Sequence, residues 1–299
     1  MRLGAAVVLS FACLLAEQPS AAAEDPLIAA LARHAEAFGS KARLLIAQET
    51  LLQRSYGYPA HRHLAIGAAA EQMRASYQVH EIISEYSIGP LKGAAPGQLV
   101  EARAISTRDG VAVLSTEAAR RRLAADLAAG EERARKKTLE ELTAMGLADV
   151  ATDYGTILLA FTPTGLADLA LSPVGSAWIG TEKAAVYTWT QERSGGALEF
   201  RGRKVARRPM KGRIWLRLTD GMPLRITAGM SHDEGAHALR DDASIDFTMS
   251  AAGCVVPASV AHRHWVDGKM LTENLYTYAP FHRFATDTRI DFGAPITPR

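Results

Sequence analysis

The sequence predicts an α+β fold in which a long, curved antiparallel sheet is covered by a few helices. From about residue 150 onward, short runs with apolar residues at alternating positions follow one another, which is typical of strands with one buried face. Turn signals such as Asp220-Gly221 and Asp267-Gly268 separate these runs, so neighbouring strands are expected to be antiparallel. Only two or three stretches have helical spacing, and a sheet that curls around them covers its apolar face most economically.

The first residues have the pattern of a secretory signal peptide. Arg2 precedes an apolar run from Leu3 to Ala16 that is too short to span a bilayer, and small residues offer a cleavage site before Glu24. We therefore expect residues 1–23 to be removed and the protein to be periplasmic or secreted. Cys254 is the only cysteine after that site, so no internal disulfide is expected.

An amphipathic helix is predicted over residues 25–38, because apolar residues recur at helical spacing behind Asp25, a good N-cap, and Pro26. Gly39 is expected to end this helix. The next stretch, 42–58, either continues as helix or turns into a strand, and the break at Gly39-Ser40 favours the strand. A strand is also expected over 76–89, and a hairpin that turns at Asp109-Gly110 over 99–115.

Residues 116–146 are rich in strong helix formers and are almost wholly charged between Gly130 and Lys137. This composition predicts one long helix, or two helices joined near Gly130, with ends that contact the body and a middle in water. Gly146 is the expected C-cap. We interpret the region as a charged helical insert in a single domain that covers residues 24–299.

Strands are predicted for most of the remaining chain, beginning with residues 154–161 and continuing to 288–293. A short helix is expected near 165–171. Residues 229–243 are expected to form a polar loop with solvated carboxylates. The clearest hairpin is 212–229, where three apolar residues, Ile214, Leu216 and Leu218, alternate with Arg213, Trp215 and Arg217.

Three phrases of the sequence, in this order of elements, resemble a known family. They are GTILLAFT, WIGTEKAAVYTWTQERSG and GRIWLRLTDGMPLRI. They resemble the secreted proteins of the LolA-like fold, which include periplasmic carriers of lipoproteins and lipids. The resemblance covers residues 76–293. It implies a half-barrel sheet closed by helices around an apolar cavity that takes acyl chains in the carriers, and it brings no catalytic signature.

The resemblance and the one-sided strands predict a non-enzymatic protein that binds a hydrophobic ligand between sheet and helices. The ligand would be a lipid, an acyl chain or a lipoprotein, and no cofactor is expected. Seven residues are expected to contact it: Trp189, Ile214, Leu216, Leu218, Phe247, Met249 and Tyr276.

Residues 201–213 carry seven cations, although the whole chain has a formal net charge of only +2. The low net charge argues against nucleic acid as a partner. The local cations are interpreted either as a strand edge protected from aggregation or as a contact with an anionic membrane. The residues expected at the membrane are Arg201, Arg203, Lys204, Arg207, Arg208 and Lys211.

Two other functions stay open from the sequence. The same sheet with a filled core would serve as an interaction or sensor module of the cell envelope, with protein partners at an edge or on the charged helix. A metal-dependent enzyme would use the His-x-His pairs, His61 with His63 and His262 with His264. No His-Glu-x-x-His motif or Cys/His cluster accompanies these pairs, so strand-face histidines without a metal are the plainer interpretation.

Overall fold

The computed structural model describes residues 25–57, 76–90, 92, 99–130, 132–150, 152–191, 198–201, 204–207 and 209–284. The predicted signal peptide, the His61/His63 pair and the expected strand 288–293 lie outside this part of the chain. Within it, none of the helices combines the length and the apolar character that crossing a bilayer requires.

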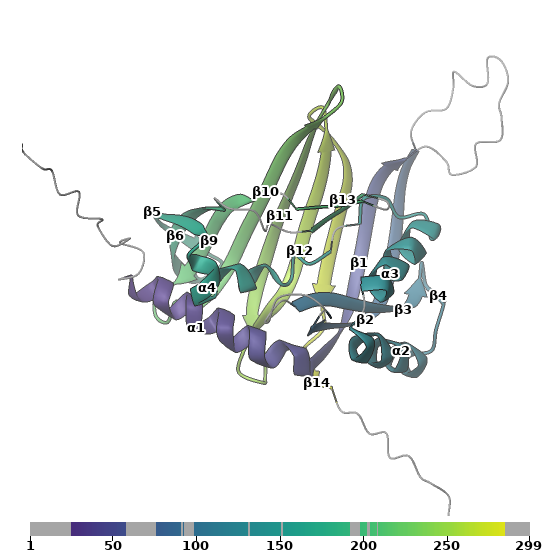
Figure 1. Ribbon diagram of the computed structural model, residues 1–299, viewed down its shortest axis with the longest axis horizontal. Helices are drawn as coiled ribbons and strands as arrows, with labels where there is room; N and C mark the ends of the chain where they lie inside the picture. The colour runs from purple at the N-terminus through teal and green to yellow at the C-terminus, as the bar shows by residue number, and fades with distance from the viewer. Residues whose placement is uncertain are drawn as a thin grey trace, which may run out of the picture.

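A single open antiparallel sheet of twelve strands dominates the described chain (Figure 1). The order of its strands is β4-β3-β2-β1-β13-β12-β11-β10-β9-β6-β5, and β14 also pairs with β1. This arrangement confirms the predicted α+β class. The strands of the sheet are β1 Leu45–Gly57, β2 Ser76–Pro90, β3 Leu99–Arg108, β4 Val111–Ala112, β5 Leu169–Ile179, β6 Glu182–Gln191, β9 Lys211–Arg217, β10 Pro223–Glu234, β11 His237–Met249, β12 Val255–Val266, β13 Lys269–Tyr278 and β14 His282–Arg283.

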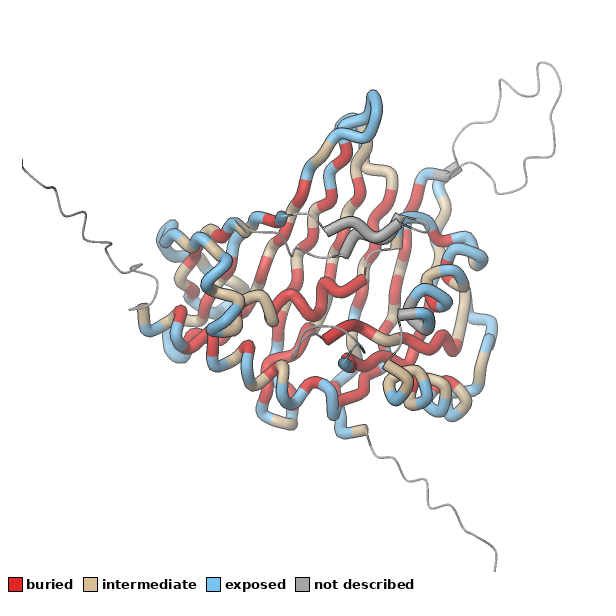
Figure 2. The backbone as a smooth tube through the Cα atoms, in the orientation of Figure 1, coloured by how far each residue is buried: buried red, intermediate tan, exposed pale blue. Residues whose placement is uncertain are grey.

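In the middle of the sheet, the first strand of the chain pairs with one of the last. β1 pairs with β13, so that Leu51 lies opposite Tyr276. A separate two-stranded sheet consists of β7 Leu198–Arg201 and β8 Lys204–Arg207. Because β1 lies between β2 and β13, the apolar faces of early and late strands form one continuous surface, seen as the buried band in Figure 2.

The first helix, α1 Pro26–Lys41, begins as predicted and ends later. The Asp25 side chain accepts a hydrogen bond from the Leu27 amide at 2.9 Å and caps the helix. Gly39 does not end the helix, contrary to the prediction. A Cβ at this position would lie 3.3 Å from Leu159, so the glycine instead lets another segment pack closely against α1.

The charged region forms two helices, α2 Thr116–Ala129 and α3 Glu132–Ala144. Gly130, in the left-handed conformation at φ 59°, ends the first of them. Leu123 of α2 packs against Ala104 of β3. The hydroxyl of Thr138, on α3, donates a hydrogen bond to the carbonyl oxygen of Arg103, the residue before Ala104 on β3. The two helices therefore pack on opposite faces of β3, beside the two-residue edge strand β4.

We call the face of the sheet that carries Trp189 and Ile245 the inner face. Helices α1 and α3 lie over it (Figure 1). The opposite, outer face carries pairs of charged residues across neighbouring strands, such as Arg225 with Asp246 and Arg263 with Glu273. The inner face is thus covered and the outer face is wet over β10 to β13, as the alternation in the sequence predicts, whereas α2 covers part of the outer face at β3.

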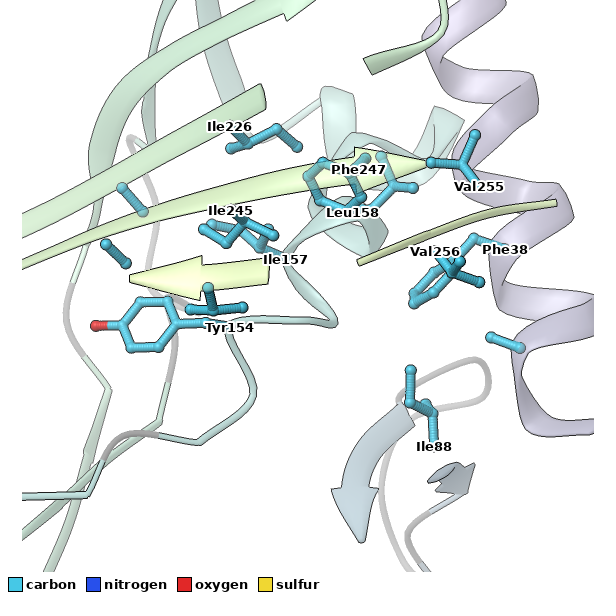
Figure 3. Packing of buried hydrophobic residues seen from close by; sticks show 14 of the residues in the cluster. Phe38, Ile88, Tyr154, Ile157, Leu158, Ile226, Ile245, Phe247, Val255 and Val256 are labelled. Carbon is cyan, nitrogen blue, oxygen red and sulfur yellow. The ribbon is translucent and has the colours of Figure 1, made fainter. Parts of the chain in front are cut away.

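A segment without strand structure also crosses the inner face, and we call residues 147–162 the crossing segment. It contains the short helix η3, Ile157–Phe161, so the predicted strand over residues 154–161 is wrong. Ile157 and Leu158 are buried against the sheet (Figure 3). Phe161 is buried as well. The apolar run indicated burial correctly, but the burial comes from packing on top of the sheet rather than from pairing within it. The short helix after it, α4, spans Pro163–Leu166 rather than 165–171.

The predicted polar loop at residues 229–243 is also wrong. β10 continues to Glu234 and β11 begins at His237, so the two strands form one long hairpin. The polar residues concealed the alternation because one of them, Asp241, belongs to the inner face, where it is 6% exposed.

Candidate functional site

The inner face has an apolar half, built by β6, β9, β10 and β11. Trp189 is 1% exposed there and meets Phe161 of the crossing segment edge to face, with 5.6 Å between the ring centroids. The indole nitrogen of Trp189 donates a hydrogen bond to the Thr227 carbonyl oxygen at 3.1 Å. Gly212 makes this possible, because a Cβ there would lie 3.0 Å from that indole nitrogen and 1.7 Å from the carbonyl oxygen.

The seven residues expected to contact a ligand fall into two groups. Five are buried on the inner face: Trp189, Ile214, Leu216, Phe247 and Tyr276. Leu218 and Met249 are 44% and 43% exposed, because β9 ends at Arg217 and β11 ends at Met249 itself. The crossing segment covers the buried group, and a ligand-binding role for any of the seven stays a prediction.

The other half of the inner face is polar and holds two connected clusters. In the first, the Oδ1 atom of Asp241 accepts hydrogen bonds from Nε2 of His262 at 3.1 Å and from Nδ1 of His264 at 2.8 Å. All three residues are buried. Burial alone would raise the pKa of Asp241, but the two imidazole hydrogen bonds outweigh it and hold that pKa well below the ordinary value of an aspartate. Tyr154 of the crossing segment stacks on His262 at 5.2 Å.

The side-chain amides of Gln53 and Asn274 connect this cluster to the crossing segment. Gln53 accepts a hydrogen bond from the Ala148 amide at 2.8 Å and donates to the Ala148 carbonyl at 2.7 Å, which fixes the orientation of its side chain. Gln53 also donates to Oδ1 of Asn274 at 2.6 Å, so the nitrogen of Asn274 is the donor toward the Asp149 carbonyl at 2.9 Å.

The orientation of Asn274 determines the tautomer of His262. The nitrogen of Asn274 lies 3.2 Å from Nδ1 of His262, so Nδ1 must accept and Nε2 must carry the proton that reaches Asp241. His262 therefore orients and stabilises the carboxylate of Asp241.

The second cluster centres on Arg103 between two buried glutamates. Arg103 donates to both oxygens of Glu49 at 2.7 and 2.8 Å, and to Glu101 at 2.7 Å. Glu101 also accepts from the Tyr86 hydroxyl and from the amides of two residues of the crossing segment, Asp153 and Gly155.

The two glutamates differ in their pKa values because their donors differ. Burial raises the pKa of Glu49, and the attraction of Arg103 only partly offsets it. Burial also acts on Glu101, but Arg103 and the additional donors hold the pKa of Glu101 below its ordinary value.

Together the two clusters attach the first half of the crossing segment to the sheet, and its second half, η3, then lies over the apolar half. Sequence reasoning missed Gln53, Asn274 and Glu101 in this role. Their only signal was a polar residue two positions from an apolar one on the same face, as with Gln53 after Leu51.

A small pocket lies at the edge of the inner face, between β3 and the α2–α3 helices. It has a volume of about 40 Å³ and is lined by Leu127, Leu139 and Leu142 beside Glu101 and Arg103. This volume accommodates about three water molecules and is too small for an acyl chain.

The histidine pair His262/His264 does not form a metal site with its neighbours. Among the residues that the structure describes, no group of three or more His, Cys, Asp or Glu side chains has an arrangement that would hold a metal ion. Asp241 takes the position at which a shared ion would be expected, and it is bonded directly to both rings.

The cationic stretch stays largely untested. Of the residues expected at a membrane, Lys211 is exposed at the start of β9. Arg201, Lys204 and Arg207 lie in β7 and β8, but their side chains fall outside the described part, as do Arg203 and Arg208 entirely.

Comparison with models of protein families and with curated proteins gave no match. Similar solved structures include one described as an outer membrane lipoprotein-sorting protein domain, from Vibrio parahaemolyticus. It shares 10% identity at a TM-score of 0.36, over 91% of this chain and 97% of that one. A LolA superfamily protein from Nitrosomonas europaea shares 9% identity at a TM-score of 0.31, over 85% and 94% of the two chains. A DUF1329 family protein from Desulfovibrio piger shares 8% identity at a TM-score of 0.36, over 91% and 95%. The family that the sequence resembles is thus among these similar structures.

Proposed function

We propose that this protein is a non-enzymatic binding protein of the cell envelope that holds a hydrophobic ligand against the apolar half of its inner face. The observation that carries the proposal is how that half is covered. Between α1 and the sheet, one short helix, η3, places Ile157, Leu158 and Phe161 on the sheet surface built by β6, β9, β10 and β11. An acyl chain or another apolar chain would replace those three side chains with little change in the chemistry of the contact.

The proposed binding therefore includes a movement of the crossing segment. Its first half is attached to the sheet by hydrogen bonds to Gln53 and Glu101, whereas η3 is held mainly by apolar contacts. A ligand competes directly with apolar contacts and not with the hydrogen bonds, so the segment would pivot at its attached half and release η3.

Native mass spectrometry of the protein purified from its own envelope, together with extraction of lipids, tests this function. We expect an apolar molecule at a stoichiometry near one. The variant Leu158→Ala/Phe161→Ala should retain more of it, because the shortened side chains leave room on the apolar half. The control is Leu123→Ala, which removes an equally buried leucine from the separate cluster under α2. Protein that is empty in all three forms would contradict the proposal.

A second function, an interaction or sensor module with a filled core, is favoured by one observation. The five expected ligand contacts that are buried are already packed against protein, and the pocket beside α3 has a volume of only about 40 Å³. Capture of one stoichiometric protein partner by empty protein would support this function over the first.

The proposal includes export to the periplasm or beyond, with a signal peptide cleaved before Glu24, and it includes no cofactor and no nucleic acid. It also includes attraction of the cationic stretch at residues 201–213 to an anionic membrane. Mass determination of the exported protein tests the cleavage site, because loss of residues 1–23 gives a defined mass difference.

A further inference from the structure

One corner of the sheet presents three apolar side chains to solvent. Trp178 and Val174 of the edge strand β5 are 67% and 55% exposed, and Leu218, in the turn after β9, is 44% exposed. Single exposed apolar residues are normal on a protein surface, but these residues gather at one corner. Trp178 lies opposite Lys183, whose carbonyl oxygen accepts a hydrogen bond from the Leu218 amide at 3.3 Å. Trp178, Lys183 and Leu218 therefore form one row across three neighbouring chain segments.

The edge strand itself adds to this surface. β5, Leu169–Ile179, contains no charged residue, although exposed edge strands usually carry charge against aggregation. The regular pairing of β5 with β6 is interrupted between Pro173 and Gly175, where the register shifts. An irregular edge with a proline is a poor template for a strand from another chain. The apolar side chains of this corner are therefore better matched to a partner that needs no hydrogen-bonded register.

The first helix begins near this same corner. Tyr187 donates a hydrogen bond to Asp25, the residue that caps α1, at 2.6 Å. Tyr187 lies four residues from Lys183 on β6, so the two share a face at a separation of about 13 Å. Figure 1 shows α1 beginning beside β5 and β6. The start of α1 thus lies on the same side of the sheet as this row.

From these observations we infer that the corner formed by Trp178, Lys183 and Leu218 docks on the surface of a lipid bilayer. An indole ring suits the boundary between headgroups and acyl chains, and the apolar stem of a lysine extends through that boundary while its ammonium group stays in water. The charges beside the row are largely balanced, because Arg217 pairs with Asp220 and Glu182. Contact at this corner is apolar, and it is distinct from electrostatic attraction of the stretch at residues 201–213. It does not depend on what the inner face binds.

Binding to vesicles of phosphatidylcholine in about 1 M NaCl tests the inference, since charges are screened beyond about 3 Å under this condition. We expect the exported protein to sediment with the vesicles, and Trp178→Ser/Leu218→Ser to bind about tenfold more weakly because less apolar area is buried. The matched control is Val111→Ser/Val113→Ser, which alters two exposed valines, 69% and 45% exposed, near the opposite edge of the sheet. This control should bind like the unaltered protein.

Fluorescence with brominated phosphatidylcholine tests the position of Trp178 independently of stability. Trp178→Phe should still bind the vesicles but lose most of the quenching, whereas Trp215→Phe should keep both binding and quenching. Equal quenching in the two variants, equal binding of the serine variant and the valine control, or loss of all binding at high salt would each overturn the inference. The mass spectrometry that tests ligand binding uses no vesicles. A negative result there contradicts the proposed function, and a negative result with vesicles contradicts membrane docking.

Discussion

Asp241 on β11 accepts a hydrogen bond from His262 on β12, at 3.1 Å between Oδ1 and Nε2, in the polar half of the inner face. The other ring nitrogen of His262 is oriented by Asn274, which is in turn oriented by Gln53. One chain of hydrogen bonds therefore extends across β11, β12, β13 and β1 and ends on the backbone of the crossing segment. Its position indicates that the polar half of the inner face fixes the segment over the apolar half.

Replacing Asp241 with asparagine should lower the free energy of unfolding by about 1–3 kcal/mol at neutral pH, because two buried imidazole N–H groups lose a charged acceptor. Chemical denaturation measures this loss. Asp246→Asn is the control, since Asp246 pairs with Arg225 at a side-chain exposure of 38%, and the expected loss is below about 1 kcal/mol.

The contribution of Asp241 to the free energy of unfolding should decrease at low pH. The pKa of Asp241 is lower in the folded protein than in the unfolded chain, where an aspartate titrates near 3.9. Its contribution is therefore complete above about pH 4 and is lost as the pH falls toward the folded value. The difference between the unaltered protein and Asp241→Asn should shrink below about pH 4, and a difference that grows there would contradict this assignment.

Removal of the Gln53 amide should release the crossing segment. Gln53→Ala breaks both hydrogen bonds to Ala148 and one to Asn274, with an expected loss of about 2 kcal/mol. Hydrogen exchange measured by mass spectrometry should be faster in peptides that cover Ala148 and Asp149. Gln48→Ala, at an exposed position of the same strand, should leave that exchange unchanged. Unchanged exchange in both variants would show that the segment is held by its apolar contacts alone.

Arg103→Leu should cost about 3–5 kcal/mol at neutral pH, because it leaves Glu49 and Glu101 buried without their cation. Both folded-state pKa values would then lie above the unfolded values, so the variant should regain stability as the pH falls through them. Denaturation at about pH 8 and pH 5 measures the regain. The control is Arg54→Leu, because the Arg54 side chain is 44% exposed and its partner Glu273 keeps a second cation, Arg263; the expected cost is below about 1 kcal/mol.

Gly212→Ala should destabilise the fold by about 3 kcal/mol, since the added Cβ would meet the Thr227 carbonyl oxygen at 1.7 Å and displace either β9 or β10. The emission of Trp189 should change as well, because its indole nitrogen donates to that same carbonyl. Gly229→Ala is the matched control. There the nearest atom is the Asp242 carboxylate at 3.2 Å, a side-chain atom that can move, so a cost below about 1 kcal/mol is expected by thermal unfolding.

The alternation of apolar and polar residues was sufficient to predict most of the sheet. It placed Ile214 and Leu216 on a buried face and Trp215 on the other, as the structure has them. The N-cap at Asp25, the hairpin at Asp109-Gly110 and the interruption at Gly130 were also predicted, because each depends on local backbone preferences. These features need no knowledge of distant parts of the chain.

The wrong predictions for residues 154–161 and 229–243 have a common physical cause. Residues 154–161 are apolar on all sides because they lie between the sheet and α1, and a buried strand would have the same composition. Residues 229–243 are polar although they form strands, because Asp241 is matched by histidines more than twenty positions away in the chain. In both cases the partner that explains the residue is distant in sequence.

The sequence by itself therefore determined the fold class, the direction and faces of most strands, and the expectation of a covered apolar surface, because strand periodicity and turn preferences act over a few residues. Only the tertiary structure decided what covers that surface. It placed η3 on the apolar half and joined Gln53, Asn274 and Asp241 into one network on the polar half. It also gathered Trp178 and Leu218 at one corner beside the start of α1. Contacts of this kind depend on the pairing of β1 with β13, which joins residues more than two hundred positions apart and leaves no local pattern in the chain.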